Sequence, residues 1–153
     1  TQSSCPAKPN CMIRFFQPEE EDRIIDAIQE AELNTSGEIR VHLEDNLKGD
    51  VLQAAQKTFL KLEMHKTEAR NGVLIFIAPE QRKLAILGDK GINEKVPKDF
   101  WSEERDIMLA HFKSGNYADG VCAAVQQVGA KLKDFFPYQS DDENELPDDI
   151  SYS

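Results

Sequence analysis

Apolar residues recur at the three- and four-residue spacing of an amphipathic helix in four stretches of the chain. The four predicted helices span residues 18–33, 50–65, 97–113 and 117–135. Pro18 and Pro97 fit the first position of a helix, and the acids after Pro18 suit the positive end of the helix dipole. In the second helix, the expected apolar face consists of Leu52, Ala55, Phe59 and Leu62. The last helix is the most regular, with one apolar stripe from Ala118 to Leu132.

Three shorter stretches are typical of β-strands. Ile39, Val41 and Leu43 alternate with polar residues, as in a strand near the edge of a sheet with one covered face. Residues 73–77 are apolar on both faces, which predicts a central strand covered by helices on each side. Residues 83–87 follow after a short turn, so we expect the last two strands to form an antiparallel hairpin.

The order of these elements predicts the fold class α/β, a single domain with a mixed β-sheet of three to four strands sandwiched between α-helices. A right-handed crossover through the second helix would make the first two strands parallel. We expect the domain to span residues 15–136, after a flexible N-terminal segment at 1–14. Residues 137–153 have no periodicity, with six acids and no base beyond residue 138, and we expect a disordered acidic tail there.

The charge balance narrows the class of partner. The chain of 153 residues has 28 Asp and Glu against 18 Lys and Arg, a formal charge of −10. Nucleic acid is therefore not expected as a partner, because its phosphates are bound by Lys and Arg. No apolar run reaches the roughly 18 residues of a membrane span, so we expect no direct membrane insertion and a cytoplasmic or otherwise soluble monomer. The chain starts at Thr1, and the native protein could start at Met12 or carry an anchor or a signal before this sequence.

The cysteines and histidines offer little chemistry. Three cysteines are a sparse and odd set, which favours a reducing compartment, although Cys5 and Cys11 could form a bridge in the N-terminal segment. Cys122 lies on the apolar stripe of the last helix and is expected to be a core residue. The three histidines lie in different predicted elements without the spacing of zinc ligands.

The expected strand directions bring three strand ends together. The starts of the first two strands and the end of the third would share one end of the sheet. The polar residues expected at this end are Ser36, Glu38, Arg70, Asn71 and Asp89. The opposite end would collect Glu44, Asp45, Glu80, Gln81 and Arg82. Glycines at positions 37, 72, 88 and 91 flank the first group, either to admit an ion or as ordinary turn residues.

Four segments of the chain resemble one protein family. They are TSGEIRVHLE at 35–44, ARNGVLIFIA at 69–78, RKLAILGDKGI at 82–92 and FKSGNYADGV at 112–121. In order and spacing they resemble the TPM-domain family, which includes thylakoid-lumen and bacterial proteins, and the resemblance covers residues 15–136. It implies a helix-covered sheet, a calcium site in an acidic pocket and, in some members, weak acid phosphatase activity. Other members act as interaction modules in membrane-protein maintenance, which implies a membrane-associated protein partner.

The candidate metal ligands are oxygen donors at the converging end of the sheet. Calcium takes six to eight oxygens from carboxylates, amides, carbonyls and water. Glu38, Asn71 and Asp89 could supply three, with Glu94 as a weaker candidate. Asp89 could instead be a turn residue that bonds its own backbone, and Glu38 a solvated or paired charge. The family often has Asp where this chain has Asn71, so the site could be weaker or differ in charge preference. Magnesium and manganese are the alternative ions.

Two arginines lie close to these candidates in the sequence. Arg40 and Arg70 could neutralise a bound phosphate, or they could simply pair with Glu38 and Asp89. The pairing is the commoner role of such arginines.

The residues favour binding over catalysis. Cys-x₅-Arg, Asp-x-Asp, G-x-S-x-G, P-loop and G-x-G-x-x-G motifs are all absent, so a covalent nucleophile has no candidate. The expected function is a calcium-binding interaction or regulatory module. The alternative is a weak metal-dependent acid phosphatase that uses metal-activated water. The acidic tail would keep the protein soluble, compete for the cation or dock on a basic partner.

Overall fold

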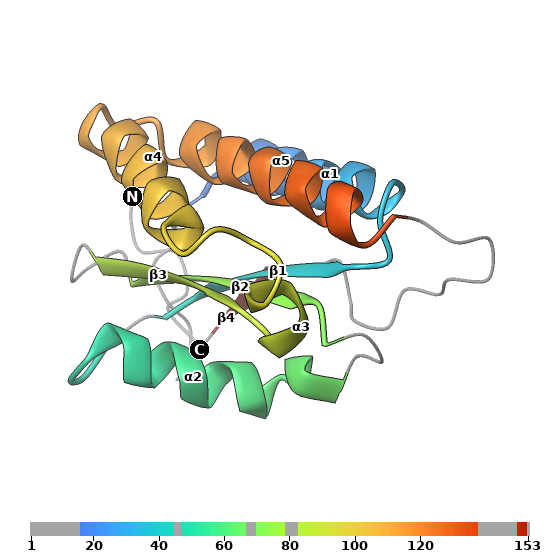
Figure 1. The fold of residues 1–153 in the computed structure, drawn as a ribbon. Helices are drawn as coiled ribbons and strands as arrows, with labels where there is room; N and C mark the ends of the chain where they lie inside the picture. Colours follow the sequence, from blue (N-terminus) through green and yellow to red (C-terminus); the bar gives the residue numbers. More distant parts are fainter. Residues whose placement is uncertain (1–15, 45–46, 67–69, 79–82, 138–149, 153) are drawn as a thin grey trace.

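The computed structural model describes residues 16–44, 47–66, 70–78, 83–137 and 150–152. Their elements, in chain order, are α1 (Pro18–Glu32), β1 (Glu38–Leu43), α2 (Val51–Lys61), the 3₁₀ turn η1 (Met64–Lys66), β2 (Gly72–Ala78), β3 (Lys83–Gly88), α3 (Lys90–Asn93), α4 (Phe100–Lys113), α5 (Tyr117–Phe135) and β4 (Ile150–Tyr152). Three layers result: α1, α4 and α5 lie on one face of the sheet and α2 lies on the other (Figure 1). The predicted α/β sandwich is confirmed.

The sheet has the strand order β3-β2-β1-β4. β1 and β2 are parallel, with Glu38 opposite Gly72, while β2 and β3 form the antiparallel hairpin with Val73 opposite Gly88. β4 pairs in parallel with β1, with Ser151 opposite His42. The strand directions deduced from the sequence are therefore correct.

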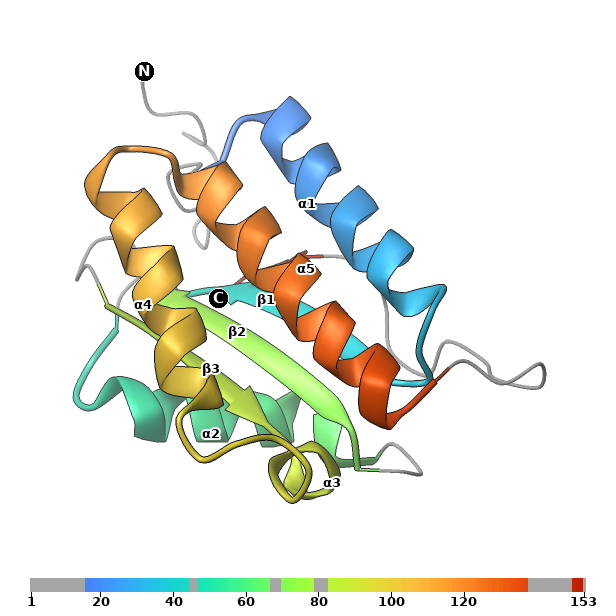
Figure 2. The same ribbon diagram turned by 45° about the horizontal axis from the view of Figure 1, so that its top comes forward.

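The face under α1, α4 and α5 holds the larger core. Ile39 and Val41 of β1, Ile75 of β2 and Ile86 of β3 face these helices and are buried. The three helices lie side by side over the sheet, with α5 in the middle (Figure 2). The strand alternation therefore directs one apolar set to this layer, and the alternate residues face α2.

The α2 face holds a smaller core. Leu74 and Phe76 of β2 pack there with Ala55 and Phe59 of α2. Asp50 caps the start of α2 by accepting a hydrogen bond from the backbone N–H of Gln53 at 3.0 Å. One helix therefore covers a face as wide as the one that three helices cover on the other side.

The ends of α1 and α5 are tied together at the start of β1. The backbone N–H of Ser36 donates to the carbonyl of Phe136 at 2.9 Å, and the hydroxyl of Thr35 donates to the carbonyl of Leu132 at 3.0 Å. An isolated bridge joins Thr35 to Pro137. These bonds fix the entry of the chain into the sheet.

Several details differ from the sequence predictions. Residues 150–152 form β4, where a disordered tail was expected, because a strand of three residues is too short to show a periodicity. The predicted helix at 50–65 ends at Lys61, and Leu52 is 47% exposed rather than on the apolar face. The predicted helix at 97–113 starts at Phe100, three residues after Pro97. Residues 1–14, with Cys5 and Cys11, and the rest of the tail at 138–149 lie outside the described residues.

None of the helices in the described part of the chain is both long and apolar enough to cross a membrane.

Candidate functional site

Three segments that are distant in sequence meet at one end of the sheet. The backbone N–H of Glu38 donates to the carbonyl of Asn71 at 3.4 Å, and the N–H of Asp89 donates to the carbonyl of Gly72 at 2.9 Å. Gly72 therefore lies between Glu38 on β1 and Asp89 after β3. The convergence predicted from the strand directions is confirmed.

The acids at this end are buried. Glu38 is 3% exposed and Asp89 is 6% exposed. At Gly72, the backbone carbonyl oxygen of Met64 lies 3.0 Å from where a Cβ would be. This glycine has no positive φ, so its role is close approach of η1 to the sheet. Two buried acids, Glu38 and Asp89, thus lie on segments that pair with Gly72 through the backbone, and a carbonyl oxygen of η1 approaches the same glycine.

Arg70 neutralises Asp89 through a two-pronged ion pair. Its Nε and Nη2 donate to the two carboxylate oxygens of Asp89 at 2.8 and 2.9 Å. Of the two side chains, that of Arg70 is 46% exposed and that of Asp89 only 6%. The hydrogen bond with Asp89 is also the main cause that raises the pKa of Arg70. Of the two roles considered for Arg70, the structure shows the pairing.

The backbone at this pair is specialised. Arg70 has φ 53°, in the left-handed region that costs a residue with a Cβ on the order of 1 kcal/mol. Its carbonyl accepts a hydrogen bond from the N–H of Gly91 at 2.7 Å. Asp89 also caps α3, since its carboxylate accepts from the N–H of Lys90 at 2.7 Å. The expected turn role of Asp89 is thus present in the form of a helix cap.

The other predicted site residues are less close to this pair. Asn71 is 1% exposed, and its amide donates to the hydroxyl of Ser36 at 3.4 Å. It directly precedes Gly72, so by strand alternation its side chain leaves the sheet on the opposite face from Glu38. Glu94 is exposed at the end of α3. Arg40 is half-buried on β1, on the same face as Glu38.

The donor set at Glu38, Met64 and Asp89 is made of oxygens, which suits a hard cation such as calcium and does not suit zinc. No group of three or more His, Cys, Asp or Glu side chains gathers within the residues that the structure describes. A cation here would therefore need amide and carbonyl oxygens and water besides the two carboxylates.

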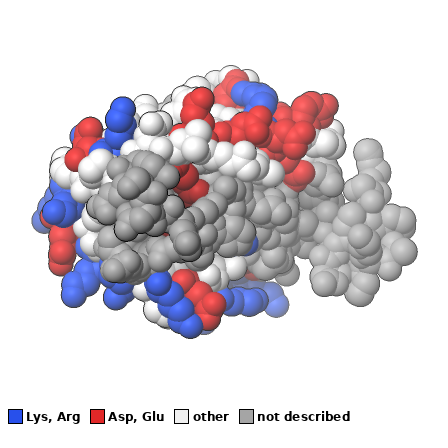
Figure 3. Space-filling model, turned by 90° about the vertical axis from the view of Figure 1, so that its right-hand side faces the viewer, with Lys and Arg blue, Asp and Glu red and all other residues white. Residues whose placement is uncertain are grey.

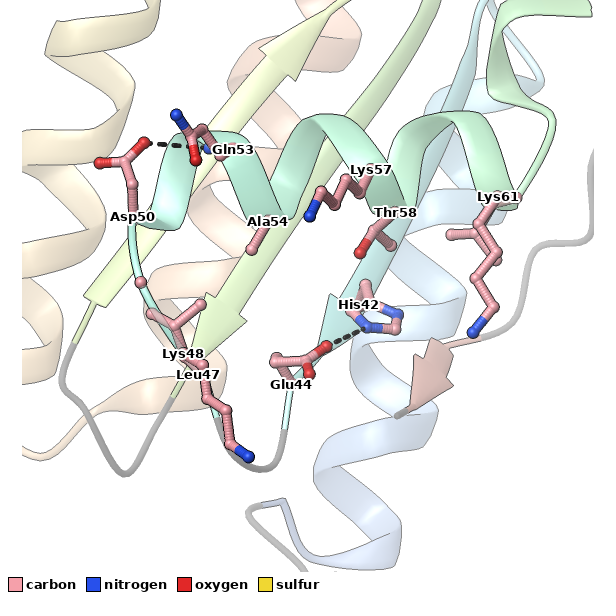
Figure 4. Close-up of a pocket in the computed structure, with 12 residues that line it drawn as sticks. His42, Glu44, Leu47, Lys48, Asp50, Gln53, Ala54, Lys57, Thr58 and Lys61 are labelled. Carbon is pink, nitrogen blue, oxygen red and sulfur yellow. Dashed lines mark hydrogen bonds and ion pairs between the residues drawn. The ribbon is translucent and has the colours of Figure 1, made fainter.

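A second feature lies between α2 and β1. It is a cleft of about 460 Å³, which we call the lysine cleft (Figure 4). The side chains that line it include His42, Glu44, Lys48, Asp50, Lys57 and Lys61. The three lysines are exposed, whereas His42 is 3% exposed at the base of the cleft.

His42 is held in place by two contacts. Its ring stacks on Phe76 at a centroid distance of 5.4 Å, and its Nε2 lies 3.2 Å from Oε1 of Glu44. Burial is the main cause that lowers the pKa of His42, with the positive charges of Arg40 and Lys61 acting in the same direction against Glu44. His42 is therefore predominantly neutral at pH 7.

The sequence reasoning missed this cleft. It placed Glu44 at the acidic opposite end of the sheet and did not include the lysines of the second helix. A signal was present, because α2 contains Lys57 and Lys61 at the i, i+4 spacing of one helix face and contains no acid. In contrast, α1 contains seven acids and one Arg, and Figure 3 shows acids over the helices of the upper layer and bases along the lower edge.

Cys122 fits its expected structural role in part. It is a free thiol, half-buried on α5, and it packs against the larger core. Burial is the main cause that raises its pKa, so the reactive thiolate is disfavoured.

Comparison with known proteins extends the sequence resemblance. A profile of the TPM domain matches residues 12–131. The NMR structure of the BA42 protein from the psychrophilic bacterium Bizionia argentinensis is 45% identical, with a TM-score of 0.85 over 92% of this chain and 97% of that one. No protein with a curated description matches the chain.

Two more distant structures share the fold. The N-terminal domain of a protein from P. gingivalis is 22% identical, with a TM-score of 0.65 over 78% of this chain and 77% of that one. The N-terminal domain of the cg2496 protein from Corynebacterium glutamicum is 16% identical, with a TM-score of 0.62 over 77% of this chain and 74% of that one.

Proposed function

The chain belongs to the TPM-domain family, and on this premise we propose that it binds a divalent cation, calcium in the first place. The proposed site is the end of the sheet where Glu38 and Asp89 converge. One observation carries the proposal: two buried carboxylates flank Gly72, and one of them is already neutralised by a cationic group. Burying a carboxylate is costly unless a positive charge accompanies it. A calcium ion would supply that charge to Asp89 in place of Arg70.

Arg70 occupies the position of this charge in the structure described above. Because its guanidinium is 46% exposed, Arg70 can move into solvent when a cation takes its place at Asp89. Glu38, Asp89 and the carbonyl of Met64 would then hold the ion, while Asn71 and Glu94 remain further candidates. Arg70 and the cation therefore compete for the same carboxylate.

We propose that the cation acts as a switch for an interaction or regulatory module. Release of Arg70 places a positive charge at the surface close to α3, which Asp89 caps, so the binding state of the ion changes the charge that a partner protein contacts. A membrane-associated protein fits the role that the family resemblance implies.

Calcium titration by NMR tests this proposal. The amides of residues 36–38, 70–72 and 88–91 should shift together, while those of residues 79–82 stay nearly silent. Asp89→Asn should lose most of the affinity, because a hard cation loses a charged ligand. Asn71→Asp should strengthen binding if position 71 is a ligand. Shifts confined to residues 141–149 would mean that the ion only condenses on the acidic segment, and they would overturn the site.

A variant of the competing arginine makes the test sharper. Arg70→Gln should raise the calcium affinity roughly three- to tenfold, because the ion no longer displaces a paired guanidinium. Lys90→Gln is the matched control, since it removes the same charge from an exposed residue next to Asp89. Equal affinities in the two variants would contradict competition by Arg70.

The second candidate function is a weak acid phosphatase. The exposed guanidinium of Arg70 beside the buried acids is the observation that favours it, because an arginine next to a metal ion can hold a phosphoryl group. The metal would supply an activated water, and Glu38 or Asp89 would hold the ion. Phosphate release from a generic monoester between pH 4 and 8, with calcium, magnesium or manganese, decides the matter. Turnover that is lost together with metal binding in Asp89→Asn would make the protein an enzyme.

A further inference from the structure

The lysine cleft lies beside a strand edge that already accepts a peptide segment. β4 pairs in parallel with β1 over Val41, His42 and Leu43, and Ser151 is the partner of His42. His42 forms the base of the cleft, and the positive charge of Lys61 contributes to lowering the pKa of His42. Figure 4 shows His42 of β1 on one side of the cleft and Lys57 and Lys61 of α2 on the other. Glu44 and Lys48 reach the cleft from the segment between β1 and α2, and β4 lies beside β1. The cleft and the β4 position are therefore parts of one surface.

The charge of this surface is positive. Lys48, Lys57 and Lys61 are exposed around the cleft. Its two acids are engaged, since Glu44 bonds His42 and Asp50 caps α2. In a chain with a net charge of −10, three exposed lysines without a free acid among the cleft's lining residues form an unusual region.

The sequence next to β4 carries the opposite charge. Residues 141–149 contain six acids and no base, and Asp148 and Asp149 directly precede Ile150. Only twelve residues separate Pro137, at the end of the described helical layer, from β4. The acidic run therefore directly precedes, in the sequence, the strand that pairs with β1 beside the cleft.

We propose that the lysine cleft and the edge of β1 form a binding site for an acidic extended peptide, and that the chain's own C-terminal segment, residues 141–152, is its occupant. Strand pairing at residues 150–152 supplies backbone hydrogen bonds, and the lysines bind the acids that precede them. The effective concentration of a tethered segment is high, so modest ion pairs are sufficient to hold it. This inference is independent of the cation site.

Charge reversal in the full chain tests the proposal. The variant Lys57→Glu/Lys61→Glu changes the cleft, and Lys95→Glu/Lys98→Glu is a matched control, because those lysines are also exposed but lie between α3 and α4. The measurement is hydrogen exchange of the β4 amides by NMR at about 20 mM salt, where screening is weak. Protection should fall roughly three- to tenfold in the cleft variant and change less than about twofold in the control.

Restoring the complementarity separates electrostatics from damage to α2. Adding Asp148→Lys/Asp149→Lys to the cleft variant should recover the protection, because the charges are then exchanged. Raising the salt to about 0.5 M should weaken protection in the wild-type protein. Equal protection in the cleft and control variants, or no response to salt, would overturn the proposal.

The occupant is tested in the same samples. Protection that does not change with protein concentration supports the intramolecular segment. Protection that rises together with dimer formation in sedimentation equilibrium would assign the occupant to a second copy and overturn the intramolecular assignment.

Discussion

The two faces of the sheet differ in how charge is distributed. On the face covered by α1, α4 and α5, the sheet contributes apolar residues such as Ile75 and Val41, and most of the acids of α1 lie on its exposed side. On the face covered by α2, polar residues of the sheet itself are buried, among them Glu38 and His42. Beside this single helix, the lysine cleft reaches as far as His42. The more thinly covered face is therefore where both candidate sites lie.

Truncation of a side chain in the larger core, under α1, α4 and α5, should have the largest effect on stability. Ile75→Ala removes a fully buried side chain from the central strand and should lower the free energy of unfolding by about 3–4 kcal/mol. Urea denaturation measures it. Leu52→Ala on α2 is the control and should stay within about 0.5 kcal/mol, because Leu52 is 47% exposed. A loss as small as that of the control would contradict the close packing of Ile75 in the larger core.

The layer of α1, α4 and α5 contains a buried acid, Glu104 on α4. It is 3% exposed, burial is the main cause that raises its pKa to about 7, and Lys131 on α5 opposes the shift. Because the pKa of Glu104 is raised in the folded protein, the fold favours the protonated carboxyl. The destabilisation caused by burying the ionised carboxylate is therefore absent below the ordinary pKa and grows as the pH rises toward 7. Its Oε1 has no hydrogen-bond partner among the described residues.

Glu104→Gln should therefore remove a pH dependence. Between pH 4.5 and 8, the wild-type protein should lose about 2–3 kcal/mol more stability than the variant. Urea denaturation at several pH values measures the difference, and Asp106→Asn, which changes an exposed acid of α4, is the control. Parallel curves for Glu104→Gln and the wild type would show that Glu104 is ionised without penalty.

A glycine marks how closely the thick face is packed. A Cβ on Gly88 would lie 2.3 Å from Cζ2 of Trp101, whose indole N–H is held by Asn93 at 2.7 Å. Gly88→Ala should cost about 2 kcal/mol, because the ring must move and lose its hydrogen bond. Trp101 fluorescence and thermal unfolding report both effects. An unchanged emission spectrum would contradict this packing.

The smallest expected effect concerns His42 on the thin face. Because its folded pKa is lowered, the neutral form is favoured, and stability is lost as the pH falls through 6.5 toward the folded value. The slope from one such group is at most about 1.4 kcal/mol per pH unit. His42→Gln should flatten the stability curve between pH 7 and 5 compared with the wild type, and His111→Gln on α4 serves as the control. Identical slopes of stability against pH in both variants would show that burial does not lower the pKa of His42.

Periodicity determined which parts of the fold were predictable. The alternation of Ile39, Val41 and Leu43 and the stripe of α5 each repeat often enough to identify their elements and the layers that they face. β4 and α3 are three and four residues long, so they show no repeat. Both are defined by tertiary contacts instead.

The candidate site was predictable only as far as strand direction allowed. The meeting of Glu38, Gly72 and Asp89 follows from parallel and antiparallel pairing alone. The two-pronged bond between Arg70 and Asp89 occurs where the backbone of Arg70 is left-handed, and no pattern of residue types predicted that conformation. The lysine cleft was missed because exposed lysines on a helix look the same in sequence whether they face solvent or a neighbouring strand.

The bond between Thr35 and Leu132 has a consequence for how the protein is made. It joins residues that are 97 positions apart, and α1 packs on α5 along its length. The apolar stripe of α1 leaves the ribosome first and has no partner until α5 has been synthesised, whereas β1, α2 and β2 can assemble within a much shorter stretch of chain. We therefore expect the parallel strand pair to form early and α1 to be among the last elements to become ordered, with its seven acids keeping the waiting helix soluble.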